Sequence, residues 1–475
     1  MPTSPSSPTS NNNTDSNNAD YDVTVLGAGP AGLAAAVAAG TAGARVALLD
    51  AGNRVGGQYW RHRDEDTGAG HHHWSTLRRL RSAVLTGPVD FRPGHAVWHV
   101  SRADHGFTVH ITDGREIRTT TLIVATGGYD RQLPFPGWTL PGVFTAGGAQ
   151  ALLKGQGVSV GRRIVVAGTG PFLLPVAAGL AEAGARVIGV FEAGSPDGFA
   201  RHPGAVLTNL DKLAEGAGYL RTLLRHRIPY RTRSTVIAAH GVDRVHTATV
   251  ARLDADWRVL PGSESQLDCD AVAVGYGFTP QLEIPLQLGC ATRLDADGSL
   301  VAVADDQQRG SVPGVYLAGE VCGVGGAPLA LVEGELAGRH AAYRTVAAVP
   351  DRRAVGRLLR RRSALRSFAA AMHASYPVRP GWLSWLDGET ELCRCEEVSV
   401  DTVRRSVVDL GATDPRTVKL LARPGMGLCQ GRVCGYATAC LVAHLRGRPT
   451  TEQDLLGIST RPIAAPITLG TLAEG

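Results

Sequence analysis

The chain has 475 residues, of which 44% are hydrophobic and 19% are charged, and its formal net charge is +5. This length allows about three domains with cores of ordinary size, and the composition excludes a fibre or a disordered scaffold. The positive charge is small for the length, so we expect no nucleic-acid partner.

The first 19 residues are almost entirely Ser, Pro, Thr and Asn, with too few apolar side chains to fold. We expect residues 1–19 to be a disordered tail. No apolar stretch of about 18 residues is free of glycine turns and no signal peptide begins the chain, so the sequence predicts a cytoplasmic protein without a transmembrane segment. Five of the eight cysteines lie in the last quarter of the chain, at spacings typical of ligands and not of a disulfide framework.

A dinucleotide-binding fingerprint opens the ordered part of the chain. Residues 21–50 predict a strand, the turn GAGPAG, an alanine-rich helix and a second strand, which is one βαβ unit. In the turn, Gly27 permits the tight bend, Gly29 lets the backbone approach a pyrophosphate, and Gly32 allows close helix–strand packing. Asp50 ends the second strand, where a carboxylate accepts hydrogen bonds from ribose hydroxyls. The further candidate contacts here are Pro30, Ala31, Gly57 and Gln58.

Later segments are expected to complete this first domain. Residues 121–130 predict a buried strand that runs into a double glycine, and residues 270–280 repeat that form, so both are expected to belong to the first domain. Residues 314–342 predict a strand ending in YLAGE and a helix whose positive end suits the electron-rich edge of a reduced flavin. FAD is therefore preferred over a nicotinamide. The candidate contacts are Thr126, Gly127, Gly319, Glu320 at the ribitol chain, Gly326 and Ala327.

A second βαβ unit follows at residues 162–194 and indicates a second nucleotide-type domain. Its turn supplies Gly168 and Gly170, but Leu173 takes the third glycine position, where a bulky side chain pushes the helix from the strand. Glu192 ends the next strand and can hold an adenosine ribose. Two equal alternatives stay open: an adenine nucleotide bound without hydride transfer, and an empty structural domain. Reduction by NADH is the less favoured interpretation.

These units define the expected fold class, which is α/β with two Rossmann-like dinucleotide-binding domains and a small C-terminal helical domain. The expected boundaries are a tail at 1–19, a split FAD domain at 20–135 and 268–345, a second nucleotide domain at 136–267, a basic linker at 346–388, a cysteine domain at 389–448 and a tail at 449–475. Seven arginines between Arg352 and Arg366 lie on a predicted helix of the linker. A solvated face is the favoured interpretation, and docking to an acidic partner or a membrane surface is the other.

Four cysteines near the end of the chain form two clusters. Cys393-x-Cys395 is followed after 33 residues by Cys429-x4-Cys434, and residues 400–412 can supply a helix that brings the two pairs together. Four thiolates suit a [2Fe–2S] cluster or a structural zinc ion. The tight Cys-x-Cys spacing beside a flavin domain favours the cluster, with zinc as the alternative. Cys440 is expected to be an ordinary thiol buried in a helix.

Over residues 20–345 the chain resembles the glutathione-reductase-like flavoproteins. That class usually has Asp where this chain has Glu320, and its disulfide reductases need a cysteine pair near the flavin; no cysteine precedes Cys269, so thiol–disulfide chemistry is not expected. Residues 389–445 resemble the bacterioferritin-associated-ferredoxin-like [2Fe–2S] domain, although its small members end in Cys-x2-Cys. With GGQYW, CRCEE and GMGLCQGRVC, the whole ordered chain resembles the large flavin subunits of opine oxidases, hydroxyproline dehydrogenases and hydrogen cyanide synthase.

The resemblance implies a subunit with FAD and a [2Fe–2S] cluster that passes electrons from an amine, imino-acid or opine substrate to a respiratory or dye acceptor. It implies as partners a second flavoprotein subunit, on which the C–N oxidation is one alternative, and a small ferredoxin-like subunit. The other functional hypotheses are a self-sufficient NAD(P)H-dependent flavin reductase and a non-catalytic electron-transfer subunit. Spacing identifies no general base, so the catalytic residues are unassigned.

Overall fold

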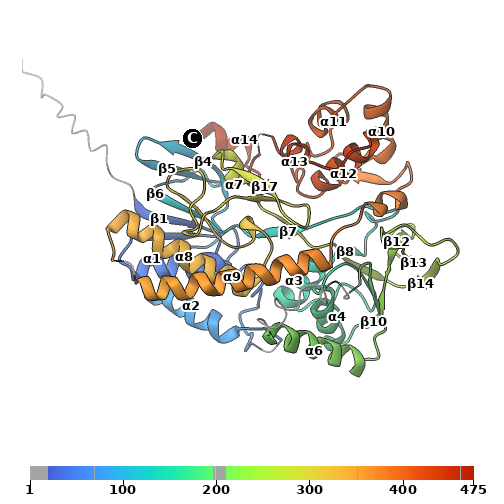
Figure 1. Cartoon of the computed structure of the whole chain (residues 1–475), viewed down its shortest axis with the longest axis horizontal. Helices are drawn as coiled ribbons and strands as arrows, with labels where there is room; N and C mark the ends of the chain where they lie inside the picture. Colours follow the sequence, from blue (N-terminus) through green and yellow to red (C-terminus); the bar gives the residue numbers. More distant parts are fainter. Residues whose placement is uncertain are drawn as a thin grey trace, which may run out of the picture.

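The computed structural model describes residues 20–68, 70–195, 198, 210–349, 351–460 and 462–474. The tail predicted at residues 1–19 lies outside them. Figure 1 shows a first sheet domain, a second sheet domain and a helical module near the end of the chain, with two long helices crossing in front of the first domain. No described helix combines the length and the apolar character needed to cross a membrane.

The first sheet surrounds the glycine turn. Its strand order is β3-β2-β1-β6-β5-β4, and β19 also pairs with β6. A Cβ on Gly334 or Gly338 of α8 would lie 2.0 or 2.2 Å from a carbonyl oxygen of α1, so these two helices touch through their backbones. The elements are β1 (Tyr21–Leu26), α1 (Pro30–Thr41), β2 (Val46–Leu49), α2 (Trp74–Thr86), β3 (Val89–Arg92), β4 (Val97–Ala103), β5 (Gly106–Ile111), β6 (Glu116–Val124), β19 (Val315–Leu317), the 3-10 turn η2 (Gly319–Cys322) and α8 (Ala327–Val346).

The second sheet has the order β11-β10-β9-β15-β8, and β12, β13 and β14 form a separate antiparallel sheet beside it. Its helices come from the βαβ pattern predicted at residues 162–194 and from the segments around it. The elements are β8 (Val143–Thr145), α3 (Ala146–Gln156), β9 (Arg163–Gly168), α4 (Leu173–Glu182), β10 (Arg186–Glu192), α6 (Leu210–Arg225), β11 (Tyr230–Thr232), β12 (Ser234–His240), β13 (Thr247–Arg252), β14 (Ser265–Asp268) and β15 (Ala271–Gly275).

The placement of β15 corrects one prediction. Val272 of β15 pairs with Val165 of β9, so this strand belongs to the second sheet and not to the first domain. The chain returns only with β16 (Phe278–Pro280), which pairs with β7 (Gly128–Asp130). A buried apolar strand that ends in glycine looks the same in either sheet, because its pattern reports burial and does not identify its neighbour. The return continues through α7 (Glu283–Gln287), β17 (Thr292–Leu294) and β18 (Leu300–Ala302).

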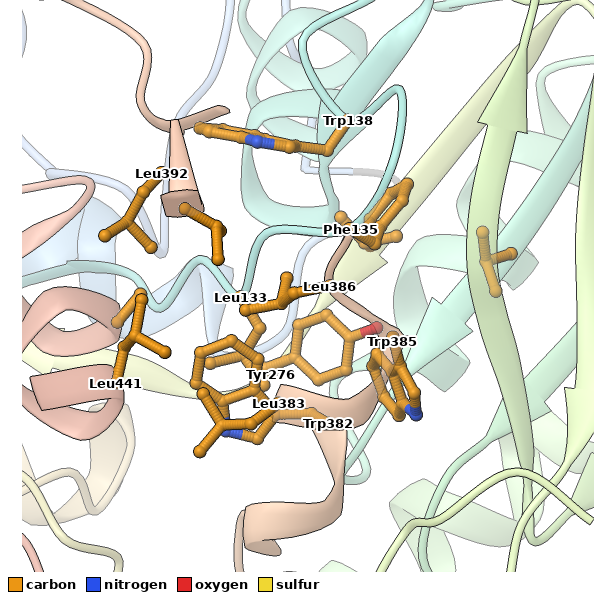
Figure 2. Close-up of a cluster of buried hydrophobic side chains, with 14 of the residues drawn as sticks. Leu133, Phe135, Trp138, Tyr276, Trp382, Leu383, Trp385, Leu386, Leu392 and Leu441 are labelled. Carbon is orange, nitrogen blue, oxygen red and sulfur yellow. The ribbon is translucent and has the colours of Figure 1, made fainter. Parts of the chain in front are cut away.

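The described residues of the linker predicted at 346–388 form an ordered part of the core. It contains α9 (Arg352–Ser375), which Asp351 caps by accepting two backbone N–H bonds, and the 3-10 segment η3 (Pro380–Trp385). Trp382 and Trp385 are 1% and 6% exposed. Figure 2 shows them in one apolar cluster with side chains of the second domain, such as Tyr276, and of the cysteine module, such as Leu441. The linker therefore holds these two parts together.

The cysteine module is mainly helical. The helix predicted within residues 400–412 is confirmed as α10, and Ser399 caps it. The segment predicted to be a C-terminal tail contains α13, which packs on α11 and α12 and starts with a capping box formed by Thr451 and Asp454. The elements are β20 (Glu391–Cys393), β21 (Val398–Ser399), α10 (Val400–Val408), α11 (Pro415–Ala422), α12 (Gly435–Leu445), α13 (Glu452–Ile458) and α14 (Leu469–Glu474).

Candidate functional site

Two glycines of the GAGPAG turn are required by the protein's own backbone. Gly27 has φ +101°, and a Cβ there would lie 2.5 Å from the carbonyl oxygen of Ala125. A Cβ on Gly32 would lie 1.7 Å from the carbonyl oxygen of Gly27. These contacts close the turn and let α1 start directly against the sheet.

At three other predicted contact positions, a side chain would extend into open space. A Cβ on Gly29 would have only Gly57 Cα nearby, at 4.0 Å, and a Cβ on Gly127 or Gly326 would have no neighbour within 4 Å. Gly29 is the N-cap of α1 and Gly326 is the N-cap of α8. These two helix starts, where the glycines leave open space for a ligand, form a glycine cradle suited to an anionic group.

Several of the remaining predicted contacts lie beside this glycine cradle. Gly56 donates its N–H to Ala28 O at 2.7 Å, and Gly57, with φ +58°, lies against Gly29. Gln58 follows and is exposed, while Thr126 donates its hydroxyl to Gln281 O at 3.0 Å. The other members of the set are Gly319, which packs on Ala31 of α1, and Ala327, the first residue of α8.

Two carboxylates flank the glycine cradle. Asp50 accepts hydrogen bonds from the backbone N–H groups of Ala28 and Gly52, each at 2.6 Å, and Glu320 accepts one from Gly326 at 3.1 Å. Burial raises the pKa of both carboxyl groups above their usual values. A carboxylate has about four acceptor positions, so each keeps capacity for a sugar hydroxyl.

Two of the seven arginines of α9 correct the prediction of a solvated helix face, whereas the other five are exposed as predicted: Arg352, Arg353, Arg357, Arg360 and Arg361. Arg362 and Arg366 contact the fully buried carboxylate of Glu333, with N–O distances of 3.2 and 2.8 Å. Glu333 also accepts the N–H of Gly319 at 3.2 Å, and Arg366 donates to Gly323 O at 2.9 Å. This network fixes the loop that carries Glu320. The arginine pattern predicts a helix, but it contains no sign of a buried acid on another helix.

We expect Arg366→Ala to lower the free energy of unfolding by about 3–5 kcal/mol, because the buried carboxylate of Glu333 would lose one of its two arginine partners. Chemical denaturation followed by circular dichroism measures the loss. Arg360→Ala, at an exposed position of the same helix, is the matched control and should change stability by less than about 0.5 kcal/mol. Equal stability of wild type and Arg366→Ala would contradict the role given to the network.

The second nucleotide-type turn is built differently from the first. A Cβ on Gly168 would lie 1.8 Å from Gly275 O, but α4 begins only at Leu173, which is 1% exposed and packed in the core. Glu192 is fully buried and accepts the N–H groups of Gly170 and Gly194 at 2.9 and 2.8 Å. Burial raises the pKa of Glu192 to about 7. In this arrangement the carboxylate of Glu192 is bonded to the backbone and shielded from solvent, and the ribose contact suggested for it stays a prediction.

The four predicted cysteine ligands are brought together as two pairs. The strongest side-chain interactions join Cys393 to Cys434 and Cys395 to Cys429, and weaker ones join Cys434 to Cys395 and to Cys429. A hydrogen bond from Cys434 is the main cause that lowers the pKa of Cys393 to about 6, and the Gly425 N–H lies 3.5 Å from the same sulfur. Cys393 and Cys434 are buried, whereas Cys395 is exposed.

Three glycines let the loop of the second cysteine cluster pack closely against the first cluster. A Cβ on Gly427 would lie 2.4 Å from Cys395 Cβ, and Gly425 and Gly431, both with positive φ, approach each other across the loop. In the part of the chain that the structure describes, no three of the four sulfur atoms lie within 4.8 Å of one another. Cys440 lies apart from both pairs, with its thiol beside Tyr436 and Thr450.

Residue spacing in the sequence did not indicate the side chains that connect the first domain to the cysteine module. Arg432, between Cys429 and Cys434, donates from Nε to Tyr129 Oη at 2.9 Å across 303 positions of sequence, and the same Nε lies 2.7 Å from Glu283 Oε1. These side chains line a cleft between the flavin domain and the cysteine module. The only sign of this contact in the sequence is an arginine between two cysteines, and its position does not identify its partners.

Residues 21–345 match the family described as pyridine nucleotide-disulphide oxidoreductase. The chain belongs to this family and is an oxidoreductase.

Individual relatives of the chain have more specific names than the family. The chain is 33% identical to an opine oxidase subunit of Agrobacterium tumefaciens (strain Ach5), over 96% of this chain and 92% of the relative. It is 32% identical to hydrogen cyanide synthase subunit HcnB of Pseudomonas protegens, over 87% of this chain and 90% of the relative. The crystal structure of L-proline dehydrogenase from P. horikoshii has the same fold, with a TM-score of 0.69 and 21% identity over 95% of this chain and 79% of that chain.

Proposed function

We propose that the chain is the FAD- and [2Fe–2S]-binding subunit of an enzyme that oxidises an amine, imino acid or opine and delivers the electrons to a respiratory or dye acceptor. One observation carries the proposal: a single chain has an open glycine cradle at two helix starts and, on a module joined to it, two pairs of cysteines. A bound flavin supplies two-electron oxidation and an iron–sulfur centre takes electrons singly, so together they connect a substrate to a one-electron acceptor.

The glycine cradle fits FAD. Gly29 and the first turn of α1 would face the pyrophosphate, and Asp50 would accept bonds from the adenosine ribose. Glu320 would take the ribitol chain, and the start of α8 at Gly326 would face the electron-rich edge of the ring. The open space at Gly29, Gly127 and Gly326 supports this fit, because a side chain at any of them would occupy it.

The cysteine geometry favours two irons over one zinc ion. Four thiolates around zinc, each at about 2.3 Å, bring all four sulfur atoms within roughly 4 Å of one another. Here the strongest sulfur interactions join Cys393 to Cys434 and Cys395 to Cys429, those across the pairs are weaker, and no three of these described sulfurs lie within 4.8 Å of one another. Two pairs suit a cluster in which each iron takes two thiolates.

The names of the relatives support the substrate class and a multi-subunit enzyme. The opine oxidase and hydrogen cyanide synthase relatives are both named as subunits, and the structural neighbour is named L-proline dehydrogenase. We infer a small amine or imino-acid donor. Two further subunits are inferred as partners, one a second flavoprotein and the other small and ferredoxin-like. In this arrangement the described chain holds two redox groups and connects them.

We expect NADH and NADPH to leave the flavin of the purified chain oxidised on the turnover timescale. The reason is the second turn, where Leu173 takes a glycine position and Glu192 is buried, so nicotinamide is not presented to the flavin. An imino acid or opine added to the assembled complex should reduce the flavin. Anaerobic stopped-flow absorbance measures both reactions.

The same experiment separates the alternatives. Fast stoichiometric bleaching by either nicotinamide would replace the proposal by a self-sufficient NAD(P)H-dependent flavin reductase. Substrate reduction of the complex, without any reduction of this chain alone, would favour a non-catalytic electron-transfer subunit.

A further inference from the structure

Arg432 uses one side-chain nitrogen within the cysteine loop and the other two to join this loop to the rest of the molecule. Nη1 donates to Cys429 O at 3.1 Å, and Nη2 donates to Ile463 O and Ala464 O at 2.7 and 2.8 Å. Nε donates to Tyr129 Oη at 2.9 Å and lies 2.7 Å from Glu283 Oε1. The side chains of Arg432 and Glu283 are only 14% and 13% exposed, so their charges act in a largely dry environment.

Tyr129 connects this arginine to the predicted flavin loop. β7 starts at Gly128, immediately after Thr126 and Gly127, and pairs with β16 so that Gly128 faces Pro280. The connection from Gly127 to Cys429 therefore consists of a short piece of backbone, the Tyr129 side chain, one hydrogen bond, the Arg432 guanidinium and a second hydrogen bond. Tyr129 Oη also donates to Glu283 Oε1 at 3.4 Å.

We propose that Tyr129 and Arg432 form the electron-transfer contact between the flavin and the cysteine centre, and that the Arg432 charge, balanced by Glu283, sets the reduction potential of that centre. This inference rests on the proposed function. Each transfer moves one electron from the reduced flavin to a ferric iron, with no bond formed or broken. Two transfers reoxidise the flavin, which releases its protons to water, and the external acceptor takes the electrons onward.

Charges near the cysteine centre shift its reduction potential in a defined direction. The reduced centre carries one more negative charge than the oxidised one, so a nearby cation stabilises the reduced state and a nearby anion destabilises it. Lys419, whose Nζ donates to Ile458 O at 2.9 Å, adds a second cation on the same side. Arg432 and Glu283 should therefore have opposite effects on the potential.

Three variants of the full chain test the contact. Arg432→Gln should shift the midpoint potential of the centre to lower values, and Glu283→Gln should shift it to higher values. Tyr129→Phe keeps the ring and removes the hydroxyl, so it should leave the potential unchanged and slow transfer from flavin to centre about tenfold, which corresponds to about 1.4 kcal/mol of barrier. The control is Arg404→Gln on α10, which pairs with Asp401 at 3.1 Å and should change neither quantity.

Redox titration followed by electron paramagnetic resonance gives the potential, and light-driven reduction of the flavin followed by absorbance gives the transfer rate. Opposite shifts for Arg432→Gln and Glu283→Gln support the proposal. If the wild-type iron signal is present but the shifts are absent or share one direction, this inference is overturned and the proposed function stands. If wild type has no iron signal, both are overturned. Should Arg432→Gln fail to fold, an unchanged potential in Glu283→Gln with an unchanged rate in Tyr129→Phe is sufficient to reject the contact.

Discussion

Gly29→Val is expected to abolish FAD retention while leaving the chain folded. Gly29 has φ −74°, which valine adopts, and the nearest atom to a Cβ there is Gly57 Cα at 4.0 Å, so a Cβ at this position fits the protein's own backbone. It would instead stand in the glycine cradle, where the pyrophosphate has to approach the backbone. The ratio of flavin absorbance to protein absorbance in the purified chain measures the loss.

Two comparisons make the Gly29 result specific. Gly218→Ala changes another glycine with open space around it, in α6 and away from the turn, and should retain full FAD. Gly32→Val should prevent correct folding, because its Cβ would lie 1.7 Å from Gly27 O. Full FAD occupancy in Gly29→Val would place the flavin elsewhere.

Cys434→Ser is expected to eliminate the iron centre, whereas Cys440→Ser should leave it intact. Cys434 is 2% exposed at the N-cap of α12 and interacts with Cys393, so its loss would remove one of the two thiolates proposed to hold one iron. Cys440 is in the same helix, but its neighbours are Tyr436 and Thr450. Visible absorbance, electron paramagnetic resonance and iron analysis of both variants provide the readout. Retention of iron by Cys434→Ser, or its loss from Cys440→Ser, would contradict the ligand assignment.

Local features of both sites could be predicted from the sequence. The contact between Gly32 and Gly27 lies within a single turn, so residue spacing alone defines it. The helix at residues 400–412 follows from its amphipathic pattern and is present as α10. The approach of the two cysteine clusters also follows from local chemistry, since Gly425, Gly427 and Gly431 allow the loop to turn tightly against Cys395.

Long-range partners could not be predicted. The arginine spacing in α9 indicates a helix, but the acid that pairs with Arg362 and Arg366 lies in α8, where Glu333 occupies an ordinary-looking helical position. The same holds for Arg432, whose partner Tyr129 comes from a strand of the first domain. Hydrophobic periodicity and turn residues describe each segment's own structure, and the choice of neighbour is made by packing of the whole chain.

Metal and flavin analysis of the anaerobically purified chain tests the central claim most directly. We expect about two iron atoms and about two acid-labile sulfides per chain, as a [2Fe–2S] cluster has, together with about one FAD and no zinc. Stoichiometric zinc without iron, or a chain that carries iron but no flavin, would contradict the claim that this one polypeptide holds both redox groups.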